Sequence, residues 1–250
     1  MRALSTAALL DVWERGLGQT LCQRALMLLA AASPEAAPEQ LARLTVGVRD
    51  ARLLTLRELT FGSSVTGVAH CSVCSTRLEL TFSAEQARVT SHAAEDADIS
   101  GSEPLSLKRG GCEIHFRLPD SVDLAAIAQL RNIAGARDVL LRRCITGAWS
   151  DGVETSIDQV PSELLESAVE RMAQADPQAD VQVTFSCPTC GQRREVAFDI
   201  ASFLWSELEI CARRVLRDVH ALASTYGWRE TDILAMSSRR RQLYLELIGA

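Results

Sequence analysis

The sequence contains little that would mark a secreted, membrane or nucleic-acid-binding protein. Aromatic residues make up 5% of the 250 residues, and lysine occurs once, at Lys108. The formal net charge is −6, which disfavours a general partner that carries phosphates. No charge-free stretch approaches membrane-spanning length, the nearest being Ala25–Ser33, and the N-terminus has no cationic segment followed by a long apolar run. We therefore expect a protein without a signal peptide or a membrane span, located in the cytoplasm.

Eight cysteines stand out against this background, and four of them belong to a repeated pattern. The stretch CSVCSTRLELTF begins at Cys71, and the stretch CPTCGQRREVAF begins at Cys187. Aligned without a gap, both follow the pattern C-x-x-C-x-x-R-x-E-[LV]-x-F. Because cysteines in a reducing cytoplasm do not form a disulfide framework, paired C-x-x-C motifs indicate metal or redox chemistry.

The two motifs predict one structural zinc site. A C-x-x-C turn between two short strands directs both thiolates into one small volume, so each copy supplies half of a tetrahedral four-cysteine site. Such a site has no open coordination position and therefore no Lewis-acid chemistry. Gly191, directly after the second pair, permits the left-handed backbone of the turn, whereas Ser75 holds the matching place in the first copy. The four expected zinc ligands are Cys71, Cys74, Cys187 and Cys190.

Other interpretations of the cysteines and histidines have less support. A redox C-x-x-C is usually single and opens a helix, whereas alternating strand sequence follows each pair here. His70 could replace one ligand, but four cysteines already complete the set. His115 and His220 lack a catalytic constellation, and no phosphate-binding glycine loop occurs, so we expect neither an enzyme nor a small-molecule substrate. The remaining cysteines lie singly on apolar faces and are expected to be core thiols: Cys22, Cys112, Cys144 and Cys211.

Periodicity indicates an α+β fold that is mostly helical, with a small four-cysteine zinc ribbon built from two hairpins far apart in sequence. One further β-hairpin is expected at Gly110-Gly111, and a helix start at Ser33-Pro34. Helical spacing predicts helices over Val48–Thr60, Leu124–Cys144, Ser162–Ala175 and Phe203–Tyr226. We expect one composite domain with six segments: an N-terminal helical segment 1–64, the first zinc-ribbon half 65–90, a loop and hairpin 91–120, a helical middle 121–178, the second zinc-ribbon half 179–200 and a C-terminal helical segment 201–250.

The C-terminal segment holds the residues expected to contact partner proteins. A helix ends at Tyr226-Gly227, and a basic triplet opens the last helix. Arginines at the start of a helix oppose its dipole and invite an acidic neighbour, although the triplet is equally compatible with a charged, solvated helix face. The candidate partner-binding residues are Trp228, Arg239, Arg240, Arg241 and Tyr244.

This C-terminal segment, with Tyr-Gly-Trp, Asp-Ile-Leu and Arg-Arg-Arg-x-x-Tyr-Leu, resembles the tail of the T-even-type bacteriophage baseplate protein family. Relatives of that family also accompany phage-tail-like contractile injection systems. The stretches Trp13–Ala32 and Val46–Gly62 and both C-x-x-C pairs are similar to those relatives, whereas the middle from Thr90 to Asp158 matches only loosely. The resemblance implies a non-enzymatic part or assembly factor of a contractile-tail baseplate, with no catalytic residues to transfer.

The leading hypothesis is therefore a zinc-stabilised scaffold that contacts other baseplate or hub proteins, in the cytoplasm or incorporated in a phage-tail-like particle. The alternative is a zinc-ribbon regulator or nucleic-acid-binding module that uses the Arg239–Arg241 cluster. A third hypothesis, a thiol-disulfide enzyme, would require exchange activity at the C-x-x-C pairs.

Overall fold

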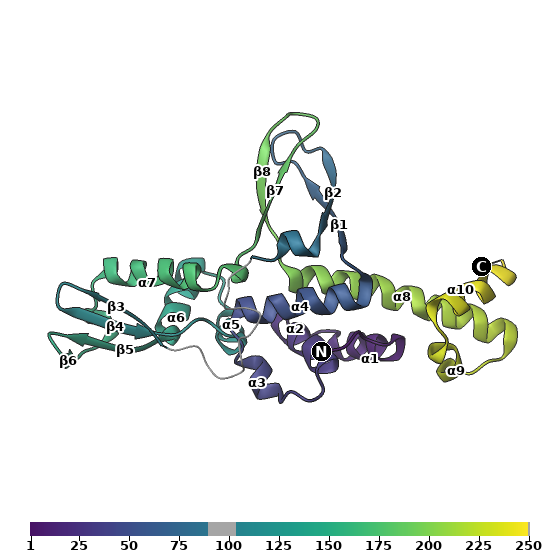
Figure 1. The fold of residues 1–250 in the computed structure, drawn as a ribbon, viewed down its shortest axis with the longest axis horizontal. Coiled ribbons are helices and arrows are strands. Elements are labelled where there is room, and N and C mark those ends of the chain that lie inside the picture. Colours follow the sequence, from purple (N-terminus) through teal and green to yellow (C-terminus); the bar gives the residue numbers. More distant parts are fainter. Residues whose placement is uncertain (90–103, 250) are drawn as a thin grey trace.

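The computed structural model describes residues 1–89 and 104–249 as an elongated molecule. A helical body lies in the middle, and two β-hairpins project from it side by side (Figure 1). An arm that combines a sheet with helices extends at one end, and the C-terminal helices form the other end (Figure 1). The polar loop expected over Ser91–Glu103 lies outside the described residues.

The secondary-structure elements follow one another along the chain in a mixed order. The helices are α1 (Thr6–Gly16), α2 (Leu21–Ala32), α3 (Pro38–Ala42), α4 (Val46–Phe61), α5 (Ser121–Ile127), α6 (Ile133–Cys144), α7 (Ser162–Ala175), α8 (Ile200–Tyr226), α9 (Glu230–Ala235) and α10 (Ser238–Leu247). The strands are β1 (Ser64–His70), β2 (Arg77–Ser83), β3 (Leu105–Arg109), β4 (Cys112–Phe116), β5 (Ile145–Ser150), β6 (Val153–Glu154), β7 (Gln182–Ser186) and β8 (Arg193–Ala197). Short 3-10 turns lie at Ala84–Ala87, Ile157–Gln159 and Pro177–Ala179. None of the helices in the described part of the chain has the length and apolar character needed to cross a membrane.

The strands form antiparallel sheets of different sizes. β1 pairs with β2, and β7 pairs with β8, so each projecting hairpin is a two-stranded sheet. The arm contains a four-stranded sheet in the order β3-β4-β5-β6. Its apolar face, with Ile114 and Phe116 fully buried, packs against α6 and α7 as a core separate from that of the body.

Helix α8 organises the body. Asp199 caps its start by accepting hydrogen bonds from the amides of Ala201 and Ser202, and Gly227 ends it in a left-handed conformation. The buried side chains recur at helical spacing and face α1, α2 and α4: Leu204, Leu208, Ala212, Val215, Val219 and Leu222. Burial of this continuous stripe stabilises the packing of α1, α2 and α4 around α8.

Buried charged pairs attach the neighbouring elements. Arg57 of α4, with 3% of its side chain exposed, donates two hydrogen bonds to Glu207 of α8, at 2.9 and 2.8 Å. At the base of the arm, Arg117 and Arg143 both donate to the fully buried carboxylate of Asp123. Burial alone would raise the pKa of Asp123, but these hydrogen bonds lower it to about 2, so the carboxylate is charged at neutral pH. These ion pairs hold α5, α6 and the end of β4 together within the arm, and the arm is linked to the body by Arg43, which donates to Asp120 at 3.0 Å.

Several expected elements are confirmed. Ser162–Ala175 is helical, the helix predicted over Val48–Thr60 is α4, and Gly110-Gly111 forms a tight hairpin with both glycines at positive φ. The fold is mainly helical with small antiparallel sheets, as an α+β assignment requires.

Three sequence-based expectations are wrong. Ser33 ends α2 rather than starting a helix, because its amide donates to the Leu29 carbonyl, and α3 begins later at Pro38. The region Leu124–Cys144 holds two helices, because the Asn132 side chain accepts from the Ala134 amide and starts α6 anew. The hairpin at Gly110-Gly111 belongs to a larger sheet, so segment 121–178 contains strands β5 and β6 as well as helices.

Replacement of Gly16 by valine should destabilise the body. A Cβ atom at this position would lie 2.2 Å from the ring of Trp205, which also receives the guanidinium of Arg24 at 4.4 Å from its centroid. We expect Gly16→Val to lower the free energy of unfolding by about 1–3 kcal/mol, measured by chemical denaturation. Gly135→Ala in α6 is the control, because its Cβ would meet no atom closer than 3.5 Å. Equal stability of Gly16→Val and wild type would contradict this packing.

Candidate metal centre

The two C-x-x-C motifs form matching turns at the tips of the two projecting hairpins. The amide of Cys71 donates to the Thr76 carbonyl at 3.0 Å, and that of Cys187 donates to the Gln192 carbonyl at 2.9 Å. A second hydrogen bond closes each turn, from the residue after the motif to the carbonyl of its first cysteine, at 2.8 and 2.9 Å. The repeat in the sequence is therefore a repeat in backbone geometry.

The residue that follows each motif adopts a left-handed backbone. Gly191 has a φ of 70°, and Ser75 has a φ of 57° although it carries a Cβ. This conformation turns the chain so that both cysteines of a motif point to one side. Ser75 consequently carries backbone strain that glycine avoids in the second copy.

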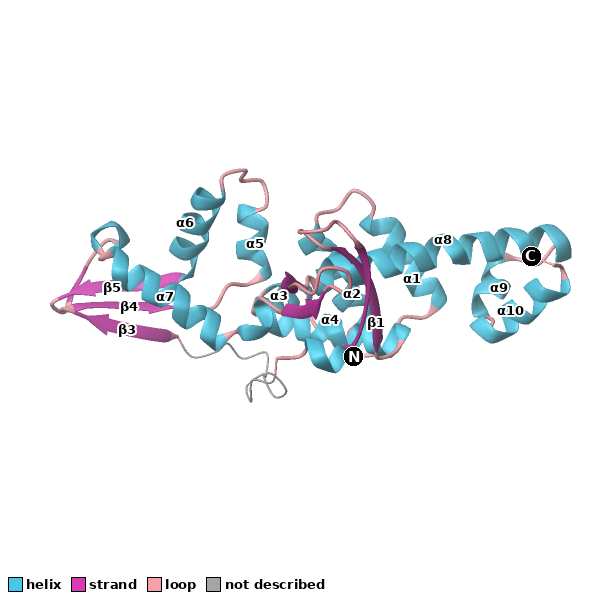
Figure 2. Ribbon diagram, turned by 90° about the horizontal axis from the view of Figure 1, so that it is seen from above, coloured by secondary structure: helices cyan, strands magenta, loops and turns pink. Residues whose placement is uncertain are grey.

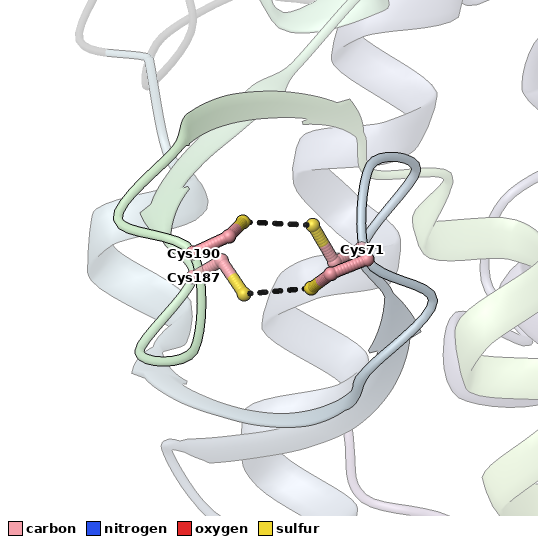
Figure 3. A group of neighbouring side chains, drawn as sticks. Cys71, Cys187 and Cys190 are labelled. Atoms are coloured by element: carbon pink, nitrogen blue, oxygen red, sulfur yellow. Dashed lines mark hydrogen bonds between the residues drawn. The ribbon is translucent and has the colours of Figure 1, made fainter.

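The four motif cysteines meet between the hairpins. Their Sγ atoms all lie within 4.8 Å of one another. The Cys71 and Cys190 sulfurs are 3.7 Å apart, and the Cys74 and Cys187 sulfurs are 3.6 Å apart (Figure 3). A tetrahedral ion with metal–sulfur bonds of ~2.3 Å would place its ligand sulfurs about 3.8 Å apart. Four soft donors at this spacing fit one metal ion with a closed coordination shell.

The ligand thiols differ in how readily they ionise. The hydroxyl of Thr76, 3.2 Å from the Cys74 sulfur, is the main cause that lowers the pKa of Cys74 to about 6. Backbone amides of Cys74 and Val73 lower the pKa of Cys71. The Gln192 amide also favours the thiolate of Cys190, yet burial and the neighbouring thiols raise its pKa to about 11. An ion that binds all four as thiolates must therefore displace protons.

A small apolar core lies directly beneath the sulfurs. Cys71 and Cys187, each with 1% of the residue exposed, pack with Leu78, and Leu80 and Phe185 adjoin them. This shell separates the cysteine cluster from the main core of the body. The cysteine cluster therefore joins hairpin to hairpin at a distance from the helices.

The last residue of the repeat fastens the hairpins to the body. Phe82 and Phe198 meet edge-on with ring centroids 5.2 Å apart, and Phe198 also contacts Phe203 of α8 at 5.4 Å. One end of each copy therefore supplies the sulfurs, and the closing phenylalanine at the other end supplies an aromatic contact at the base of the hairpins.

The other cysteines and His70 lie outside this cluster. Cys144 is fully buried in the arm, and burial raises its pKa to about 11, which agrees with the expected core thiol. Cys22, Cys112 and Cys211 are only partly buried. In the described residues, the group that could hold a metal contains the four motif cysteines and no histidine.

The candidate partner-binding residues gather at the C-terminal end of the molecule. Trp228 stacks on Tyr226 at 4.4 Å and meets Tyr244 edge-on at 4.8 Å, so these aromatic rings hold α8 and α10 together. Arg240 lies over the Tyr244 ring at 5.8 Å.

The basic triplet does not form one exposed cluster. Arg239 and Arg240 are exposed, whereas Arg241 is 5% exposed and faces the body, with its guanidinium 3.9 Å from the Asp218 carboxylate. The expectation of a solvated triplet is therefore wrong for Arg241, because α10 folds back on α8 and turns this side chain inward.

Two features of the site had weak sequence signals. The Thr76 hydroxyl matters through its distance to Cys74, and the aligned position in the second copy is Gln192, so the repeat pattern does not contain it. The exposed face of α10 includes Leu243 and Leu247, 54% and 75% exposed, and helical spacing alone predicts only that they bury against one another or against a partner.

Comparisons with known proteins point to one family. A family model described as T4 bacteriophage base plate protein matches residues 28–205. No curated protein and no solved structure matches the chain. The matched range contains both cysteine motifs and the whole arm, and it ends within the first turns of α8.

Substitutions after the two motifs should change metal affinity in opposite directions. Ser75→Gly removes a left-handed non-glycine residue, so we expect tighter binding of added Co²⁺, by up to about 1–2 kcal/mol. Gly191→Ser introduces the same strain in the second turn and should weaken binding by a similar amount. Absorption of the thiolate–Co²⁺ complex in competition titrations measures both; identical affinities of the two variants would contradict the strained-turn assignment.

Proposed function

The chain belongs to the T4 bacteriophage base plate protein family, and we propose that it is a non-enzymatic baseplate component or assembly factor of a phage-like contractile tail or injection system. The observation that carries this proposal is the family match over residues 28–205, which spans the two hairpins and the arm. The proposed partners are other baseplate or hub proteins. The protein would be present in the cytoplasm before it acts in assembly or becomes part of the particle.

We further propose that Cys71, Cys74, Cys187 and Cys190 hold one structural Zn²⁺. The donor set of four thiolates is the one that zinc prefers in closed sites, and the sulfur spacing supports a tetrahedral ion. Bound zinc would stabilise the contact between hairpins whose paired cysteines lie 113 and 119 residues apart. It would supply no catalytic step, because its coordination shell is complete.

The C-terminal end offers one surface for a partner protein. Arg239 and Arg240 project into solvent beside the exposed side chains of Leu243 and Leu247 on α10. An apolar stripe next to two cations favours a partner that presents apolar side chains flanked by carboxylates. Trp228 and Tyr244 contribute by holding α10 in place against α8.

The nucleic-acid-binding alternative has less support. Burial of Arg241 leaves two exposed arginines of the triplet, on a chain with a formal net charge of −6. Because the attraction to nucleic acid scales with the number of phosphates neutralised, two contacts give only weak binding.

Purified protein should contain about one zinc ion per chain, because four thiolates complete one tetrahedral shell. Cys71→Ser with Cys187→Ser should lose the ion, since each hairpin then supplies a single thiolate. Cys211→Ser is the matched control, because Cys211 lies on α8 away from the cluster. Elemental analysis against protein concentration measures the ratio; a stable, correctly folded wild-type protein without metal would overturn the zinc assignment.

Charge introduced on α10 should separate the protein from its partners. Leu243→Asp with Leu247→Asp places carboxylates on exposed positions, so the fold should persist while co-purification with baseplate proteins falls by about tenfold or more. Leu59→Asp on α4, another exposed leucine at 49%, is the control. Quantitative mass spectrometry of affinity-purified assemblies measures the amount of baseplate protein that co-purifies. Unchanged association of the double variant would exclude α10 as the contact surface.

A further inference from the structure

Helices α5 and α6 form a helical hairpin that stands away from the rest of the molecule (Figure 2). Its apolar side chains are open to solvent: Val122 is 36% exposed, Leu130 is 45% exposed and Ile133 is 86% exposed. The hairpin also carries smaller exposed apolar residues, namely Ala125, Ala126, Ala128 and Ala134. Apolar residues concentrated on one projecting element, rather than scattered singly, mark a contact surface.

The loop end of the hairpin has little apolar burial of its own, whereas Leu140 and Leu141 near the end of α6 pack against the core of the arm. The buried residues of α5 are Ser121 and Asp123, both polar, and the buried residue of α6 is Cys144 at its last position. α5 has 7 residues and α6 has 12, lengths at which helices are marginal in water without packing. A partner that covers these helices would supply the burial that the chain itself does not.

The base of the hairpin is nevertheless held firmly. Asp120 caps α5 by accepting from the amides of Val122 and Asp123, and it also receives a hydrogen bond from Arg43 at 3.0 Å. The ion pairs of Asp123 with Arg117 and Arg143 fix the first turn from the other side. A surface that is exposed at its tip and fixed at its base is preorganised, so a partner would spend little free energy on ordering it.

The exposed charges on the hairpin are mainly positive, because the carboxylate of Asp138 on α6 pairs with Arg142 at 2.9 Å. Between Asp123, whose carboxylate is buried, and Asp138, the charged residues are Arg131 and Arg137, and both are exposed. A partner surface complementary to this one is apolar at its centre and carries Asp or Glu at its rim. Contact between two copies of the same hairpin would instead bring the arginines of both chains together, which like-charge repulsion opposes.

We propose that the α5–α6 hairpin is a docking surface for a second baseplate protein, which binds through an apolar segment flanked by carboxylates. The inference rests on the proposed baseplate function and names a contact on the arm, in addition to the C-terminal contact at α10. The arm and the C-terminal helices lie at opposite ends of the molecule (Figure 1), so the protein bridges two partners.

The test introduces carboxylates on the exposed face without disturbing the fold. Leu130→Asp lies in the connection between the helices, and Ile133→Asp lies at the first residue of α6, where the helix dipole favours a negative charge. Circular dichroism should therefore match wild type. We expect the double variant to be retained in purified sheath-and-baseplate particles at least about tenfold less than wild type. Val153→Asp on β6, an exposed valine at 70%, is the matched control and should be retained normally.

Photo-crosslinking from residue 133 within the particles identifies the partner. The expected product joins this position to a different baseplate protein, at a segment that combines apolar residues with Asp or Glu. A crosslink between two hairpins, together with a dimer in sedimentation analysis that the double variant loses, would overturn the proposal in favour of self-association. If particles that contain the wild-type protein retain the double variant equally well, the hairpin is excluded as a contact surface, and the proposed function is unaffected. Particles that form normally without the protein, and never contain it, would contradict the proposed function and therefore also the proposed hairpin contact.

Discussion

The meeting of four thiols at the tips of two hairpins is the contact on which the arrangement of the projecting hairpins depends. Neither hairpin is large enough to be stable alone, since a two-stranded sheet is marginal in water. Between them lies a core of only a few apolar residues. A metal ion shared by both would contribute on the order of 10 kcal/mol, which exceeds what this small core supplies. The edge-on contact of Phe82 with Phe198 then transmits the fixed pairing of the hairpins to α8.

From α8 the molecule extends in both directions with well-defined surfaces. The C-terminal end is held by the aromatic contact of Trp228 with Tyr244, and the arm is linked to the body at its base by the ion pair of Asp120 with Arg43. Exposed apolar side chains lie beyond both points, at Leu247 and at Ile133. This combination of rigid connections and uncovered apolar tips suits the scaffold role proposed for this member of a baseplate family.

Much of this could be predicted from the sequence because the signals were local. The C-x-x-C spacing and its repetition identified the four cysteines, and Gly227 after a long periodic stretch identified the end of α8. The failures had non-local causes. The sequence does not predict strand β5, because Gly147 breaks the alternation of apolar and polar residues. In the structure the ring of Trp149 occupies the space where a side chain at position 147 would lie. The burial of Arg241 depends on α10 folding back on α8, which helical periodicity does not specify. Helical spacing predicts one helix over Leu124–Cys144, where the chain forms α5 and α6, and apolar periodicity is the same whether a face is covered by its own chain or by a partner.

Quantitative mass spectrometry of sheath-and-baseplate particles from the native cell, with and without this gene, tests the central claim most directly. A structural component is predicted to appear in the particles at a fixed ratio to other baseplate proteins. An assembly factor is predicted to be missing from finished particles, and particles should fail to form in cells that lack its gene. Normal particles that neither contain nor require the protein would contradict the account.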